Sequence, residues 1–73
     1  MKNRITQTPE DKSSFITVMY RPSGFFAVLF WWNPEGFWEP MESSIIPFLT
    51  YAGALIEAEQ WAGDEGVPVL VEA

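Results

Sequence analysis

The sequence has 73 residues, no cysteine and no histidine, and it carries four basic residues against ten acidic ones. This composition excludes a disulfide-stabilised scaffold, a histidine-dependent serine triad and a zinc site built from cysteine or histidine. A chain of this length forms one small domain of marginal stability, so association with a partner is the remaining means of stabilising it.

The charges are unevenly distributed along the chain. All four basic residues, Lys2, Arg4, Lys12 and Arg21, precede Gly24, whereas eight of the ten acidic residues follow it. Lysine and arginine contacts to phosphate dominate nucleic-acid affinity, so we expect no direct binding to nucleic acid. An acidic surface favours solubility, and it also suits a basic protein partner.

The first part of the chain differs from the rest. Residues 1–13 are polar, contain Pro9 and show no apolar periodicity, so we expect a flexible tail there and a single domain over residues 14–73. No apolar segment follows the basic start, which argues against a signal peptide and favours a cytoplasmic protein that does not associate with membranes.

The longest apolar run, Phe25 to Trp32, is bounded by turn residues at 21–24 and 33–36. Neither of its alternating faces is polar, so we expect a central strand that is covered on both sides. Residues 15–20 are rich in β-branched and aromatic side chains and predict the strand before it. A third strand is expected from Phe37, at an edge or interrupted because Pro40 cannot donate to a ladder, and residues 41–46 could resume it.

A helix is expected after the strands. Thr50 is suited to the N-cap, and apolar residues from Tyr51 onward recur at spacings of three and four, with Leu55 and Trp61 expected to be buried against the sheet. Gly63 or Gly66 would end the helix. Residues 67–71 then predict a last strand, at an edge or with Pro68 among its first residues.

These elements predict an α+β fold, a small antiparallel sheet of three to four strands packed by one helix in the order β-β-β-α-β. One helix covers only one face of such a sheet. The other face carries half of the apolar run, so we expect a homodimer or a complex that buries it around Trp31 or Trp32.

The candidate binding residues surround the turn at 33–36. They are the aromatic residues Trp31, Trp32, Trp38 and Phe37 and the acidic residues Glu35, Glu39 and Glu42. The aromatic rings suit either packing across strands or a recognition surface. Carboxylates beside tryptophan also occur in glycosidase sites, but so short a chain does not provide the walls of a substrate cleft.

We therefore expect a non-enzymatic protein–protein interaction module, an adaptor, inhibitor or assembly factor, with no catalytic residue, cofactor or metal. A small-ligand or carbohydrate binder that uses the tryptophan cluster is the alternative. A strand, the Gly36-Phe37 turn and an alanine-rich acidic helix opened by Thr50 also resemble the core of HicB-type antitoxins over about half the chain. The Gly-Cys element of that family is absent here, and we do not assign the chain to it.

Overall fold

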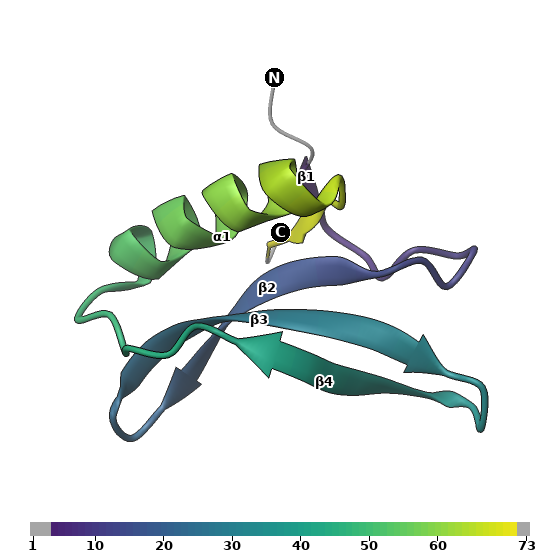
Figure 1. Cartoon of the computed structure of the whole chain (residues 1–73), viewed down its shortest axis with the longest axis horizontal. Coiled ribbons are helices and arrows are strands. Elements are labelled where there is room, and N and C mark those ends of the chain that lie inside the picture. Colours follow the sequence, from purple (N-terminus) through teal and green to yellow (C-terminus); the bar gives the residue numbers. More distant parts are fainter. Residues whose placement is uncertain (1–3, 72–73) are drawn as a thin grey trace.

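The computed structural model describes residues 4–71 and forms a small α+β domain with one helix and one mixed sheet (Figure 1). The elements are β1 (Arg4–Ile5), β2 (Phe15–Arg21), β3 (Gly24–Asn33), β4 (Phe37–Ser43), α1 (Tyr51–Glu65) and β5 (Val69–Leu70). The strand order in the sheet is β1-β5-β2-β3-β4. The predicted α+β class is confirmed, and the apolar run is a central strand, β3, between β2 and β4.

The sheet differs from the prediction in its number of strands and in their directions. It has five strands rather than three to four, and β5 pairs in parallel with both β1 and β2, whereas only β2, β3 and β4 are antiparallel. β5 is an inner strand, and Pro68 stands directly before it, which agrees with the second predicted alternative, Pro68 at the start of the strand. At the other side of the sheet, Pro40 and a bulge beside Phe30 interrupt β4, so the edge of β2 is the better place for the chain to return after the helix.

The helix begins and ends where the sequence predicts. The Thr50 hydroxyl oxygen accepts a hydrogen bond from the Gly53 amide at 3.0 Å, which satisfies one of the free donors of the first turn. Gly66 has a left-handed backbone with φ of 72°, and this ends the helix.

The main core lies between α1 and the sheet. Ile16, Ala27 and Leu29 of the sheet and Ala58 and Ala62 of the helix form its buried cluster, together with Val69. The predicted burial of Leu55 and Trp61 is only partial, because alanine side chains bring the helix close to the sheet and leave the larger residues at the sides of the contact.

No helix covers the opposite face of the sheet in the described residues (Figure 1). Aromatic side chains cover one another there. Phe15 of β2 stacks on Phe30 of β3 with ring centroids 5.4 Å apart. Phe15, Phe26 and Val28 are buried even though they face away from α1. This face therefore has its own small aromatic core within one chain.

The expected tail makes contacts that the sequence did not predict. Arg4 and Ile5 form β1 beside β5, and Arg4 forms an ion pair with Glu59 of α1. These residues add to the edge of β5 that would otherwise be unpaired. The polar composition of the segment does not reveal this pairing. The flexibility of residues 1–13 stays a prediction, and residues 1–3 lie outside the described part.

No helix within residues 4–71 is both long and apolar enough to span a membrane.

Candidate functional site

The predicted aromatic residues lie on both sides of the sheet. Trp32 and Trp38 are opposite each other on β3 and β4, with ring centroids 5.2 Å apart in an edge-to-face arrangement. The Lys12 ammonium lies 4.5 Å from the centre of the Trp32 ring. Trp31 precedes Trp32 and belongs to the other face of the strand, and Phe37 is largely exposed. The Trp32–Trp38 pair is thus engaged in packing within the chain.

The predicted carboxylates are not brought together either. Asn33 joins one of them to the turn after β3, because its side-chain amide nitrogen donates to the Glu39 carboxylate at 2.8 Å. Its amide oxygen accepts from the backbone amide of Glu35, also at 2.8 Å. Glu42 lies near the opposite end of β4. The Glu39 carboxylate therefore has a structural role at the turn, Glu35 contributes its backbone amide there, and Glu42 belongs to a different surface.

That surface is a groove between α1 and the segment that leads into it. It encloses about 610 Å³ and is lined by two sets of residues. Those from β4 and the following loop are Glu42, Ser43, Ser44, Ile45, Ile46 and Phe48, and those from the helix are Glu57, Gln60, Trp61, Asp64 and Glu65. The helical residues recur at spacings of three and four and so share one side of α1. We call this surface the acidic groove.

Hydrogen bonds to β3 hold the loop wall of the acidic groove in place. Phe48 exchanges two backbone hydrogen bonds with Phe25, at 2.8 and 2.9 Å. Ser44 donates its amide to the Ala27 carbonyl at 2.8 Å, and its hydroxyl oxygen accepts from the Ala27 amide. The loop is therefore fixed at both ends, and the residues between these anchors project from the sheet.

The residues that project are aliphatic. Ile45 is 93% exposed, Ile46 is 72% exposed, and Leu49, just beyond Phe48, is 96% exposed. Isolated exposed apolar residues are common, but Ile45 and Ile46 both line the acidic groove, and exposed apolar patches mark interaction surfaces. Leu49 is not among the lining residues of the groove.

The charge of the acidic groove is of one sign. Four carboxylates line it and no lysine or arginine does. The Trp61 indole nitrogen donates to the Glu65 carboxylate over 3.4 Å, one helical turn away, which directs this carboxylate along the helix. The described residues contain no group of three or more potential metal ligands. The acidic groove thus offers apolar contact and negative potential.

Of the predicted site residues, only Glu42 lines the acidic groove. The sequence does contain a signal for two of the others, since Ile45 and Ile46 precede Pro47 in a segment with neither helical nor strand periodicity. Aliphatic residues in such a segment have no regular element through which to reach the core. The sequence pattern predicts that residues 41–46 could resume a strand, and the strand β4 ends at Ser43, before these aliphatic residues.

Comparison with protein-family models, with curated protein sequences and with solved structures found no match for this chain. The resemblance to HicB-type antitoxins thus gains no support.

Proposed function

We propose that the protein is a non-enzymatic interaction module that binds a basic, partly apolar segment of another protein in the acidic groove. The observation that carries this proposal is the combination of exposed aliphatic residues with a rim of carboxylates along one groove. Adaptor, inhibitor and assembly factor are the roles that such binding would serve, and the cytoplasm is the compartment that we expect.

The aliphatic part of the surface would supply affinity. Burying a large aliphatic side chain is worth about 1.5–3 kcal/mol, and Ile45 and Ile46 of the groove gain little of this in the chain alone. Phe48 and Trp61, which are half-buried, form the firmer parts of the groove walls. A partner that inserts apolar side chains here would release water from both surfaces.

The carboxylates would supply selectivity and rapid association. Glu42 lies on one wall, and Glu57, Asp64 and Glu65 lie along the helix on the other. Complementary charge steers a partner towards its site and excludes partners of the same sign. The net charge of −6 extends this attraction over the molecule, and salt screens it.

A labelled amphipathic peptide of lysine and leucine provides the test, with fluorescence anisotropy as the readout. We expect binding at low ionic strength that weakens as salt is added, and no binding of the matched peptide in which glutamate replaces lysine. The double variant Glu57→Gln, Asp64→Asn should weaken binding of the lysine peptide about tenfold or more.

The matched control removes the same two charges outside the groove, as Glu10→Gln, Glu35→Gln. If the control weakens binding as much as the groove variant does, net charge alone attracts the peptide and the proposed site is wrong. The variant Ile45→Ser, Ile46→Ser tests the apolar part in the same assay, and unchanged affinity there would contradict it.

Small-ligand or carbohydrate binding at the tryptophan residues stays an untested alternative.

A further inference from the structure

The charges of α1 are arranged against the dipole of the helix. The carbonyl end of a helix is negative, so basic residues stabilise its last turn and acidic residues its first. In α1 the first turn has no acidic residue and the last turn has no basic one, whereas Asp64 and Glu65 both stand in that last turn. Both also line the acidic groove. A cation bound beside them would offset this unfavourable arrangement, so this end of the groove favours a basic partner.

Neither wall of the acidic groove offers a strand edge to which an extended partner could add. In the loop wall, Ser44 and Phe48 use backbone groups to bond β3, and Pro47 has no amide. Along β4, Pro40 and the bulge beside Phe30 interrupt the ladder. The backbone groups of α1 are paired within the helix. An extended segment would lose water from its backbone groups without gaining partners, whereas a helix pairs these groups within itself.

The positions of the charges also match a partner helix better than a strand. Glu57 and Glu65 are eight residues apart on α1, which corresponds to about 12 Å, or about two turns of a partner helix. Glu42 lies on the opposite wall. In an amphipathic helix, polar positions border the apolar stripe on both sides, so its lysines reach both walls while its apolar side chains enter the groove. A strand with its apolar side chains in the groove directs its lysines away from it, because side chains alternate between opposite faces.

We infer that the partner segment enters the acidic groove as a basic amphipathic helix of about two to three turns, with cations beside the last turn of α1. This inference rests on the proposed function and adds the conformation of the partner to it. The apolar stripe of the helix covers Ile45 and Ile46, and its cations face Asp64 and Glu65. Grooves that bind helices in this way recognise apolar side chains at spacings of three and four along one face.

A second copy of this chain does not provide such a helix. α1 is the one helix within residues 4–71, and it contains no lysine or arginine. All four basic residues of the sequence precede Gly24. The occupant is therefore a different protein.

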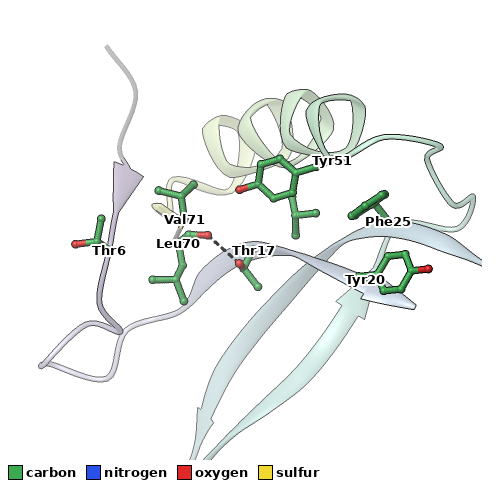
Figure 2. Close-up of a pocket in the computed structure, with 8 residues that line it drawn as sticks. Thr6, Thr17, Tyr20, Phe25, Tyr51, Leu70 and Val71 are labelled. Carbon is green, nitrogen blue, oxygen red and sulfur yellow. Dashed lines mark hydrogen bonds between the residues drawn. The ribbon is translucent and has the colours of Figure 1, made fainter. Parts of the chain in front are cut away.

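A second hollow, of about 450 Å³, provides an internal reference for the test (Figure 2). Thr17 and Tyr20 of β2, Tyr51 of α1 and Leu70 of β5 are among the residues that line it, and none of its lining residues is charged. A cationic helix gains no ion pair there, so its binding should leave this hollow unchanged.

The experiment compares three labelled peptides of identical composition with the full chain at low ionic strength. The first, Leu-Lys-Lys-Leu-Leu-Lys-Lys-Leu-Leu-Lys-Lys-Leu, has helical spacing, and the second alternates leucine and lysine over the same length. The third is the first with its two central lysines in the D form, which disrupts a right-handed helix without changing charge or composition. Fluorescence anisotropy should show that the first binds about tenfold or more tightly than either of the others, and circular dichroism should show that it gains helix on binding.

The outcomes separate this inference from the proposed function. Equal binding of the three peptides would overturn the helix and leave the acidic groove as a site for basic, apolar segments. Binding of none of them would overturn both proposals. Amide NMR shifts with the first peptide should occur at Ile45, Ile46 and Trp61. Shifts at Thr17 and Tyr20 instead would place the peptide in the uncharged hollow and would overturn the inference.

A variant of the last turn completes the test. Asp64→Asn should weaken binding of the first peptide several-fold and raise the melting temperature of the free protein, because it removes an unfavourable contact with the helix dipole. The matched control, Glu35→Gln, removes one charge outside the groove and should leave the affinity within about twofold. Equal affinities of Asp64→Asn and the unmodified chain would show that the cations do not lie beside the last turn.

Discussion

At the scale of single residues, Gly24 fixes the position of the loop that forms one wall of the acidic groove. Its φ is +140°, a region that residues with side chains rarely adopt, and a Cβ placed there would lie 2.8 Å from the Phe48 carbonyl oxygen and 2.9 Å from Pro47 Cβ. The start of β3 and the loop therefore approach each other more closely than any other residue at position 24 would allow.

We predict that Gly24→Ala destabilises the fold by roughly 2 kcal/mol or more, because backbone strain of about 1–3 kcal/mol adds to this contact. Gly36→Ala is the matched control, since Gly36 also has a positive φ, of 109°, but its added Cβ would meet nothing within 4 Å. Chemical denaturation gives the two free energies of unfolding. Equal losses for both variants would show that the contact with Phe48 is unimportant.

Asp11 provides a second prediction at this scale. The Ser13 hydroxyl donates to its carboxylate at 2.7 Å and the Ser13 amide donates at 3.1 Å, and these bonds lower the pKa of Asp11 below its usual 3.8. Because the pKa is lowered in the folded chain, the contribution to stability is present above about pH 4 and is lost as pH falls through the lowered pKa.

We expect Ser13→Ala to raise the pKa of Asp11 back towards 3.8, as followed by the carboxyl carbon in an NMR titration. A titration midpoint at or above 3.8 in the unmodified chain would contradict the hydrogen-bonded turn.

At the scale of elements, the close approach of α1 to the sheet depends on its alanines. Ala58 is fully buried, whereas Ala52 lies on the exposed side of the same helix. Alanine and leucine have similar helix propensities, so the two positions isolate the effect of packing.

We predict that Ala58→Leu destabilises the fold by about 1–3 kcal/mol or more through overpacking, whereas Ala52→Leu stays within about 0.5 kcal/mol of the unmodified chain. Thermal and chemical unfolding measure both. Tolerance of leucine at position 58 would mean that the helix does not lie this close to the sheet.

The elements also show which parts of the fold the sequence determines locally. Thr50, Gly66 and the run from Phe25 to Trp32 act through neighbouring residues, and their predicted roles are confirmed. The pairing of β5 with β2 depends on which sheet edge is open after the helix, and the addition of β1 depends on β5. Neither pairing leaves a local pattern in the sequence, so the sequence does not predict that the sheet has parallel as well as antiparallel strands.

For the molecule as a whole, the homodimer stays a prediction. The physical reason for expecting it, an apolar sheet face left exposed in a single chain, is weaker in the folded structure. Val28, which faces away from α1, is fully buried within one chain, and Phe15 and Phe26 are nearly so. The half-buried Trp32 and Trp38 retain some surface that a second copy would cover.

Sedimentation equilibrium at micromolar concentration decides this point. A dimer mass that Trp32→Ser reduces to a monomer would support association through this face. A monomer whose tryptophan fluorescence is shielded from quenchers would contradict it, and would show that the aromatic core is complete in one chain.

The candidate site is harder to predict than the fold, because its residues come from parts of the chain that are far apart in the sequence. The sequence predicts a binding cluster from tryptophan and glutamate near one turn, yet Trp32 and Trp38 pack against each other and Glu39 holds the turn. The acidic groove joins Glu42 to helix residues 15 or more positions away, and only the return of the chain over the sheet brings them together.

Amide NMR shifts of the full chain during titration with the lysine–leucine peptide would show whether the acidic groove is the binding surface. We predict shifts concentrated in residues 42–48 and along the helix from Glu57 to Glu65, with the resonances of Phe37 and Trp38 unmoved. Shifts concentrated at Trp32, Phe37 and Trp38 instead, or no shifts at low ionic strength, would show that the acidic groove is not the binding surface.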